Sequence, residues 1–532
     1  MPDGMPGCKG SKPARELFLD RQLPPENLRE KNRNDTMKKS ATLIFLFYAL
    51  TLLAQTPQFT WNYPAVTSQT HQYLLDASGN ENDYFTSILA GTRDHVALSS
   101  VQAFKESWMR LFRPDDSSAF YQQRSTTKGQ TWDLRFQLFT GYEYVRPDGE
   151  DAFSLPYYGG TIAGRIGTQL SFFADMWKGH YSNNVTYAFN NSPLIKSWVQ
   201  FNDDHTQVYV DKVRARMQYD TAVGRFAVGR GTYQIGSNIG GSIILSDAQN
   251  DYGYLSANWE IGQLSVSFLH ATLIPDSTTT SQEKDYADKY LATHILDWHP
   301  SNRFHAFFGE HVVYGNRSLD ASYLLPHTIM RITEHNLNDR DNVLMFAGTE
   351  LAYGTGNTFY FNASMDEFSS SELGTDSWKN KFALQLGNAI YLGKMRFCTE
   401  FTAVRPWMYT HRFLVSKFSH NGHPLGFPDG SNLIQYAGEL NLPLPYRSTL
   451  NIHGAYTRQG SLGNSFTINY ESRPSDSAPW LAGTITDISD VVANLAVRTL
   501  AHHLLSLGYH YRYSTDALGA TNEITLAYQV RY

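Results

Sequence analysis

The feature that most constrains this chain is a period-two alternation of apolar and polar residues, which recurs from residue 132 to the last residue. In the terminal run "TNEITLAYQVRY", Ile524, Leu526 and Tyr528 alternate with charged, hydroxyl and amide residues. An extended strand with this pattern carries its apolar side chains on one face. The same alternation marks "WDLRFQL" at 132–138, "KFALQLGNAI" at 381–390 and "LLSLGYHYRY" at 504–513.

Segments of this kind number roughly eighteen, each about ten residues long and bounded by Gly, Asn, Asp, Ser and Pro clusters. One such strand also suits a soluble sandwich, but a sandwich seldom needs so many long strands. Closing the sheet removes the unpaired edges, which lipid does not tolerate. The sequence therefore predicts an all-β protein: a closed antiparallel transmembrane β-barrel of about 18 strands with a small N-terminal helical element.

The composition favours the barrel over other membrane and soluble classes. Aromatic residues make up 14% of the chain and charged residues 18%, the latter below the ~25% usual for soluble domains. The mean hydropathy of -0.39 argues against membrane helices, each of which needs about 20 consecutive apolar residues. The net charge of -6 suggests no nucleic-acid partner.

The front of the chain predicts export. "MKKSATLIFLFYALTLLAQT", beginning at Met37, has two lysines, an apolar run and then polar residues, which is typical of a secretory signal peptide. We therefore divide the chain into an upstream extension from a misplaced start (1–36), the signal peptide (37–54), an N-terminal periplasmic segment (55–127) and the barrel (128–532). In the periplasmic segment, Val101, Phe104 and Trp108 recur at helical spacing. A short buried helix is the alternative to the signal peptide.

The two cysteines, Cys8 and Cys398, lie on either side of the predicted signal peptide. Removal of the signal would leave the mature chain with one thiol and no internal disulfide.

Cations recur on the polar face of several predicted strands. Lys212, Arg214 and Arg216 oppose Val213, Ala215 and Met217, so in a barrel these cations are expected to line the lumen, as are His510 and Arg512. Two interpretations stay open: ion pairs that fill the lumen, or a binding track for an acidic sugar.

The sequence carries no strong catalytic or metal motif. "GRGTYQIGSNIGG" lacks the Gly-Lys-Ser/Thr ending of a phosphate loop, and the chain holds no HExxH, CxxC or GxSxG pattern. We therefore predict a protein that is not an enzyme, with no cofactor and no metal.

Clusters of aromatic and polar residues are better candidates for ligand binding, since sugar rings stack on aromatic side chains and sugar hydroxyls need donors and acceptors nearby. "MWKGHYSNN" offers Trp177, His180 and Tyr181, and "RPWMYTHRF" offers Trp407, Tyr409 and His411. The alternative for each is an aromatic girdle at the membrane boundary.

Several stretches resemble boxes of Wzi-like capsule-assembly outer-membrane proteins. "FAVGRGTYQIGSNIGGSIILSD" is similar to a box in which a strand ending in Gly-Arg leads through a Gly-rich turn to Ser-Asp. Similar features follow in "KYLATHILDWHPSNRFHAFFGEHVVYGNRSLDASYLLPH" and "DRDNVLMFAGTEL", and "VRPWMYTHRFLVSKFSHNGHPLGFPDGSN" resembles the version in gliding-motility proteins of the RemB type. The matched residues are Gly229, Arg230, Ser246, Asp247, His294, Gly309, Glu310, Tyr323, Pro326, Asp341, Asn342 and Arg405.

The resemblance covers about residues 130 to 532 and departs where the family often has Trp-Gly-Pro, since this chain has Gln234, Ile235 and Gly236. It implies a barrel of about eighteen strands and a lectin-like role in holding surface polysaccharide. The matched residues could equally be fold markers, with Glu310 and Arg230 forming a buried lumen pair.

We therefore predict a bacterial outer-membrane barrel that binds or organises capsule or exopolysaccharide without catalysis. Its expected partners are outer-membrane lipid, surface polysaccharide and, during biogenesis, the barrel-assembly machinery, which would read Tyr532 at the end of the closing strand. The alternatives are a transport pore, a surface component of gliding motility or adhesion, and an outer-membrane hydrolase.

Overall fold

The computed structural model describes residues 121–531, apart from 128–129, 168, 192–198, 203, 277–287, 302, 355–356, 373, 501–502 and 517–518. The predicted upstream extension, the signal peptide, the helix expected near Val101 and the terminal Tyr532 lie outside the described residues.

The described chain is almost entirely β-structure, with two short α-helices, α5 (Val185–Asn191) and α6 (Met330–Asn336), and 3-10 turns that include η2 (Ala321–Leu324), η3 (Ser370–Glu372), η4 (Leu414–Ser416) and η5 (Tyr470–Ser472). Among these residues, no helix is both long and apolar enough to cross a membrane. The strands are β1 (Tyr121–Thr127), β2 (Gln130–Pro147), β3 (Phe153–Ile166), β4 (Leu170–Asn183), β5 (Val199–Phe201), β6 (Gln207–Asp220), β7 (Arg225–Gly231), β8 (Tyr252–Ile261), β9 (Leu264–Thr272), β10 (Lys289–Ser301), β11 (Phe304–Gly315), β12 (Asn342–Tyr353), β13 (Asn357–Glu367), β14 (Lys381–Leu392), β15 (Met395–Val404), β16 (Ser419–His420), β17 (His423–Pro424), β18 (Leu433–Leu444), β19 (Ser448–Gly460), β20 (Ile485–Leu500), β21 (His503–Ser514) and β22 (Ala520–Arg531).

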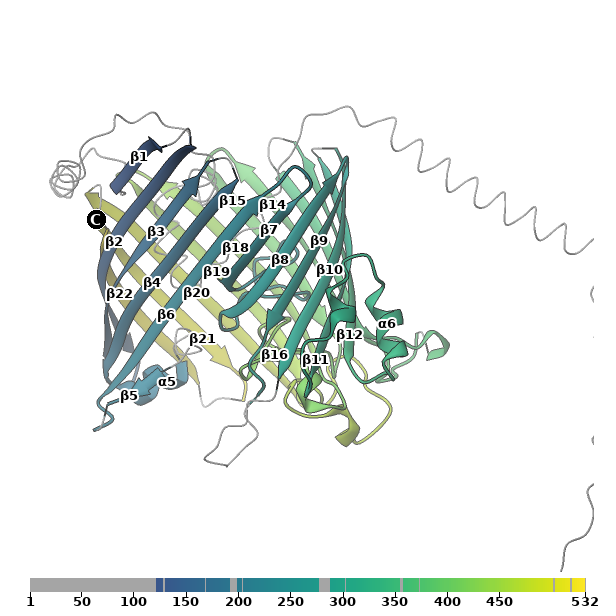
Figure 1. Ribbon diagram of the computed structural model, residues 1–532. Coiled ribbons are helices and arrows are strands. Elements are labelled where there is room, and N and C mark those ends of the chain that lie inside the picture. Colours follow the sequence, from purple (N-terminus) through teal and green to yellow (C-terminus); the bar gives the residue numbers. More distant parts are fainter. Residues whose placement is uncertain are drawn as a thin grey trace, which may run out of the picture. The chain divides into compact units, whose positions relative to one another are not determined.

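Eighteen strands form a closed antiparallel ring (Figure 1). The main sheet holds 20 strands, of which β1 pairs only with β2 and β5 only with β6, so 20 minus 2 leaves 18 in the ring. Each ring strand pairs with the next ring strand along the chain, and β22 closes the ring on β2, from Phe139 opposite Arg531 to Pro147 opposite Glu523. β1 pairs with the remaining part of β2, up to Tyr121 opposite Phe136. The predicted closed barrel of about eighteen strands is confirmed.

The two faces of the wall follow the alternation seen in the sequence. On β22, Ile524, Leu526 and Tyr528 are 51%, 47% and 41% exposed, whereas Ala527 and Gln529 are buried. The exposed apolar series forms the outer surface, since the other face contacts the loops folded inside the barrel. A closed barrel whose outside is apolar satisfies all its ladder hydrogen bonds within lipid.

The two ends of the barrel differ. At the end that also holds the start of β2 and the end of β22, strands are joined by tight turns such as 221–224, 262–263, 393–394 and 445–447. The other end carries the long connections 232–251, 316–341, 405–432 and 461–484. In bacterial barrels short turns face the periplasm and long loops face the outside. Segment 405–432 joins β15 to β18 at this second end and is therefore extracellular.

Two extracellular loops fold back into the lumen and build a core there. Loop 232–251 contributes Ile235, Ile243, Ile244 and Leu245, and loop 405–432 contributes Met408, Tyr409, Phe418, Leu425 and Phe427, all of them buried. They pack on inward side chains of the wall, among them Leu269, Leu291, Phe307, Leu344, Phe346 and Leu433. A second core joins α5 to β2, β3, β4 and β6.

Candidate functional site

Loop 232–251 is held inside the barrel by polar side chains of the wall. The Glu400 carboxylate on β15 accepts hydrogen bonds from the backbone N–H groups of Ile239 (2.9 Å) and Gly240 (3.1 Å). Asn362 on β13 donates to the carbonyl of Ser237 (2.8 Å), and Gln385 on β14 donates to that of Gly241 (2.8 Å). These wall residues lie in the middle of their strands, so the loop reaches deep into the lumen.

The two inserted loops also fasten to each other. The Tyr409 hydroxyl donates to the carbonyl of Ile243 (2.9 Å), and the backbone N–H of Ser246 donates to the carbonyl of Leu425 (2.7 Å). Gly241 has a φ of +110°, and a Cβ there would lie 2.4 Å from the Pro428 ring. The junction therefore needs glycine both for its backbone conformation and for its space.

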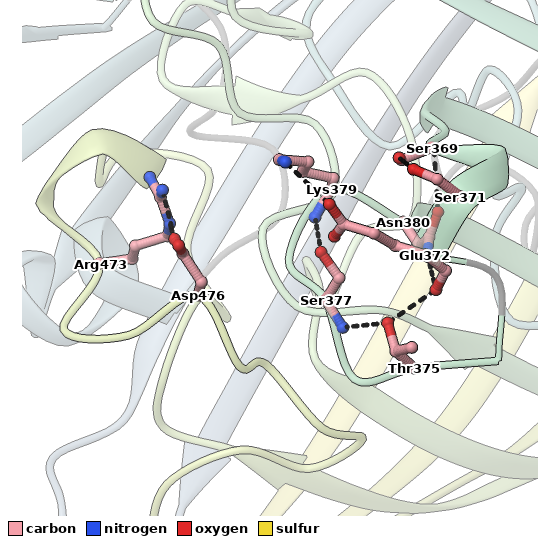
Figure 2. A network of polar contacts seen from close by, with 9 residues as sticks. All are labelled: Ser369, Ser371, Glu372, Thr375, Ser377, Lys379, Asn380, Arg473 and Asp476. Carbon is pink, nitrogen blue, oxygen red and sulfur yellow. Dashed lines mark hydrogen bonds and ion pairs between the residues drawn. The ribbon is translucent and has the colours of Figure 1, made fainter.

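Outside this core, two further loops carry a network of polar side chains, shown in Figure 2. We call its nine residues the polar pad: Ser369, Ser371, Glu372, Thr375, Ser377, Lys379, Asn380, Arg473 and Asp476. Lys379 binds the Glu372 carboxylate at 2.8 Å, and Arg473 binds the Asp476 carboxylate at 2.6 Å. A bridge between Ser377 and Ser477 joins loop 368–380 to loop 461–484. The pad is thus one surface made from two loops that are distant in sequence.

A stack of aromatic rings supports the pad from below. The Trp378 and Tyr470 rings stack with centroids 4.8 Å apart, and the Arg473 guanidinium lies 3.9 Å from the centroid of Trp378. Trp407 and Ala478 complete this buried cluster. The predicted residue Arg405, which is 3% exposed, donates to the carbonyls of Asn380 (3.3 Å) and Ser377 (3.2 Å). The pad therefore rests on a packed foundation rather than on free loops.

The exposed groups of the pad are hydroxyls, carboxylates and cations. The Asp476 side chain is 80% exposed and that of Lys379 is 47% exposed. A hydrogen bond from Lys379 lowers the pKa of Glu372, and one from Arg473 lowers the pKa of Asp476. Both carboxylates therefore stay ionised to pH values below their ordinary titration range, and the pad offers donors and acceptors of the kind that hydroxyl-rich ligands need.

The structure separates the first set of aromatic candidates. Trp177 and Tyr181 lie on the inner face of β4 and are buried in the core beside α5. His180 lies between them in sequence, so its side chain is on the outer face of the strand, where its ring is 5.7 Å from that of Tyr209.

The second set belongs to loop 405–432. Trp407 is buried beneath the polar pad, and Tyr409 is fully buried at the junction of the two inserted loops. His411 is half-buried, and its Nδ1 accepts a hydrogen bond from the Phe413 N–H (3.2 Å). Burial lowers the pKa of the His411 imidazole to about 3, so the ring is neutral at physiological pH.

The cations expected to line the lumen on β6 and β21 lie on the inner face of the wall. Arg214 and Arg216 share the inner face of β6, where Arg214 binds Asp251 at 2.9 Å and Arg216 binds Gln218 at 2.7 Å. Lys212 lies on the same face, and His510 and Arg512 both bind Asp490 at 3.1 Å. Ion pairs therefore hold Arg214 on β6 and, elsewhere on the inner wall, His510 and Arg512 on β21.

Gly229, Ser246 and Asp247 are part of the barrel interior. Gly229 lies against the ring of Tyr254, and a Cβ there would be 2.5 Å from the tyrosine oxygen. Ser246 and Asp247 belong to loop 232–251, where the Ser246 hydroxyl accepts a hydrogen bond from the Ala248 N–H (3.2 Å).

The expected lumen pair of Arg230 and Glu310 does not form, because neither residue faces the lumen. Arg230 is exposed and shares its strand face with Phe226 and Val228, which are 40% and 45% exposed. Glu310 shares its face with Phe308, and its cross-strand neighbour His294 shares that of Leu296. Phe308 and Leu296 are 50% and 47% exposed on the outside of the barrel, which fixes the direction of all four side chains.

The other matched residues of this region lie next to His294 and Glu310. Tyr323, Pro326 and Asp341 belong to loop 316–341, and Asn342 begins β12. The Tyr323 hydroxyl donates to Asp341 (2.7 Å), whose carboxylate also accepts two hydrogen bonds from Arg317 (2.8 and 2.6 Å). These residues brace a loop that covers the outer wall.

Sequence reasoning missed all nine residues of the polar pad and two aromatic residues of the stack that supports it. Two stretches without strand periodicity, "SSSELGTDSWKN" and "NYESRPSDSAPW", contain Trp378, Tyr470, Arg473 and Asp476. Their shared signal is a tryptophan among Ser, Asp and Asn in a long connection between predicted strands. That signal places a residue on an extracellular loop, but it does not indicate which loops meet.

The closed ring, its apolar outer surface and its long extracellular loops together define an outer-membrane β-barrel protein. Neither the family models nor the curated proteins contain a match to this chain.

Several solved structures are similar to the barrel at low sequence identity. One is Wzi of Escherichia coli, described as an outer-membrane protein involved in group 1 capsule assembly and a carbohydrate-binding β-barrel; it is 11% identical, with a TM-score of 0.48 over 87% of this chain and 98% of Wzi. OccK8 (OprE) of Pseudomonas aeruginosa is 6% identical over 75% of this chain and 98% of its own, with a TM-score of 0.44. OprD of the same organism is 9% identical over 75% and 94%, also with a TM-score of 0.44.

Proposed function

We propose that this protein binds surface polysaccharide at its extracellular face, in capsule or exopolysaccharide attachment or assembly, without catalysing a reaction. The observation that carries the proposal is the polar pad: a fixed surface of hydroxyl, carboxylate and cationic groups on the outside of a barrel whose lumen holds two inserted loops. A repeating polymer of hydroxyl-bearing rings can engage such closely spaced donors and acceptors repeatedly, so that weak individual contacts add up along the chain.

The pad also meets the requirement of preorganisation. Its two loops are already joined by the bridge between Ser377 and Ser477, and Arg473 is fixed between Trp378 and Asp476. Binding then loses little conformational entropy on the protein side, which favours affinity for a flexible glycan.

The proposal is tested with purified protein and a panel of capsular and lipopolysaccharide glycans. Replacing Arg473 and Asp476 together with Ala is expected to weaken glycan binding about tenfold, or about 1.4 kcal/mol. The matched control replaces Arg458 and Asp487, an exposed ion pair of 3.0 Å on β19 and β20 that lies outside the pad, and is expected to bind as the wild type does. The proposal fails if no glycan of the panel binds and deletion of the gene leaves cell-associated polysaccharide unchanged.

The charged inner face of β6 favours one second candidate, a transport pore. Lys212, Arg214 and Arg216 form a row of cations on the lumen side of the wall, which is a suitable lining for an anion path. Single-channel recording in planar bilayers separates the two functions, since a barrel closed by its inserted loops is nearly silent and a pore conducts.

A further inference from the structure

The outer wall of the barrel carries polar groups at a height where other strands meet lipid. Glu310 lies six residues from the periplasmic end of β11 at Phe304, about 20 Å along the strand and about 15 Å in height at the usual tilt. The apolar belt of such barrels is about 25 Å tall. Glu310, and His294 opposite it, therefore stand at the level of the acyl chains, where an uncovered carboxylate or imidazole is costly.

Loop 316–341 covers these groups. The backbone N–H of Met330, at the start of α6, donates to the Glu310 carboxylate (2.7 Å), and Nδ1 of His294 lies 3.2 Å from the carbonyl oxygen of Thr328. Further along the wall, the Tyr314 hydroxyl accepts a hydrogen bond from the Asp320 N–H (3.2 Å) and pairs with His270 (2.8 Å). The loop thus supplies hydrogen-bond partners to Glu310, His294 and Tyr314 on the outer face of the wall.

Apolar packing fixes the loop in this place. Tyr323 and Met330 are fully buried against Ala292, Val312 and Tyr314, which all project from the outer face of the wall. In Figure 1, α6 lies beside the barrel wall next to β12 and outside the ring of strands. The loop is therefore a packed layer on the outside of the barrel.

Part of the outer surface of this layer is apolar. Leu325, Ile329 and Ile332 are 46%, 58% and 57% exposed, and Ile329 and Ile332 are three residues apart, on one side of the start of α6. The nearest uncovered wall residues are Leu296 and Phe308, which form a cross-strand pair directly below His294 and Glu310. The apolar surface of the loop is thus continuous with the lipid-facing band of the barrel.

The charged residues of the segment are tied to a neighbouring loop. Arg331 and His335 each pair with Asp339, which also binds Arg412 of loop 405–432. This group joins the segment to the extracellular loops, which places it toward the water rather than the acyl chains.

We propose that loop 316–341 is embedded in the outer leaflet, with Leu325, Ile329 and Ile332 in contact with lipid acyl chains. It is a monotopic element built on a transmembrane barrel: the wall strands supply the hydrogen bonds on one side and lipid covers the other. This inference concerns a surface separate from the polar pad, so it does not depend on the proposed glycan binding.

The test places a nitroxide spin label on single cysteines, in protein that lacks Cys8 and Cys398 and is reconstituted in liposomes. Collision rates with oxygen, which concentrates in lipid, are compared with those for a water-soluble nickel complex. For labels at Ile332→Cys and Ile329→Cys, the collision rate with oxygen is expected to exceed the collision rate with the nickel complex several-fold. The wall control Phe308→Cys is expected to behave in the same way. At the extracellular control Ser475→Cys the order is expected to be reversed.

Two results would overturn the inference. One is a collision pattern at Ile332→Cys like that of Ser475→Cys, which would place the segment in water. The other is low collision with both reagents together with a short label-to-label distance, which would assign the surface to a second copy of the chain. Heat-dependent migration on gels reports folding of each variant, and Leu325→Cys replaces either helix variant that does not fold.

Discussion

The carboxylate of Glu310 accepts a hydrogen bond from the backbone N–H of Met330 at 2.7 Å, on the outside of the barrel wall. Replacing Glu310 with Leu leaves this N–H without an acceptor in an apolar setting, which costs about 1–3 kcal/mol. We expect loop 316–341 to detach locally and to be cleaved at Arg331 by trypsin. Glu310→Gln keeps an acceptor oxygen and is expected to resist cleavage; equal cleavage of both variants would contradict this role.

The pH dependence of loop 316–341 is expected to follow Glu334 on α6. Burial, together with the charge of Asp339, raises the pKa of the Glu334 carboxyl to about 7, although Arg331 and the Asp341 N–H oppose the shift. The folded protein therefore binds this proton more tightly than the unfolded chain does. The contribution of the protonated Glu334 carboxyl to the stability of the folded protein is fully present below about pH 4.5, and it is lost as the pH rises through about 7.

Hydrogen exchange measures this dependence directly. After correction for intrinsic rates, the amides of 330–339 in the wild type are expected to be better protected at pH 5 than at pH 8. Glu334→Gln, which cannot ionise, is expected to give similar protection at both values. A wild-type pH response that survives in Glu334→Gln would assign the effect to another group.

Glu400 is expected to keep the lumen closed. Because its carboxylate accepts the N–H groups of Ile239 and Gly240, Glu400→Ala should loosen loop 232–251 and raise the frequency of conducting events in planar bilayers. The control is Glu439→Ala, since Glu439 also lies on the inner face but binds Arg396 on the neighbouring strand instead of the loop. Conductance that rises equally in both variants would mean that lumen charge, and not the loop, sets the barrier.

Gly241→Ala is expected to disturb the junction of the two inserted loops. The added methyl group would clash with Pro428, and alanine at this position would also adopt an unfavourable φ. The loss in the free energy of unfolding should therefore exceed the ~1 kcal/mol expected from the unfavourable φ alone. Gly422→Ala is the matched control, because Gly422 has a φ of +79° but nothing within 4 Å of the added atom. Urea unfolding compares them, and an equal loss of stability in the two variants would rule out the steric role of Pro428.

Arg405 is expected to hold the foundation of the polar pad. Arg405→Met keeps most of the side-chain volume but removes the hydrogen bonds to the carbonyls of Ser377 and Asn380. We expect faster proteolysis of loop 368–380 on intact cells and weaker glycan binding, while the exposed-site control Arg458→Met behaves like the wild type. Unchanged proteolysis would show that the aromatic stack suffices without Arg405.

The barrel was predictable because its wall repeats one local rule. Gln137, Ala383 and Gln385 face inward, and Leu138 and Leu386 face outward, as the alternation predicts. β20 carries a weaker alternation, because its inner face mixes Ile488 and Val492 with Asp490. The two faces of this strand therefore differ little in polarity, although the strand pairs along its full length.

The site was less predictable because it depends on where loops fold. The rule that polar residues face the lumen fails for His294 and Glu310, because loop 316–341 covers them on the outside of the wall. No local sequence pattern specifies the position of that loop. Likewise, Trp378 and Tyr470 meet across almost one hundred residues of sequence. Alternation gives the direction of a side chain from its strand, but it does not give the partner.

The pairing of β22 with β2 also sets an order for folding. All other ladders of the ring join strands that are neighbours along the ring sequence, whereas this one joins the two ends of the described chain. Among the ladders of the ring, the pairing of β22 with β2 therefore has the largest entropic cost of loop closure. The wall can therefore grow hairpin by hairpin, and the Phe139 to Arg531 seam forms last, when a curved open sheet becomes a sealed cylinder.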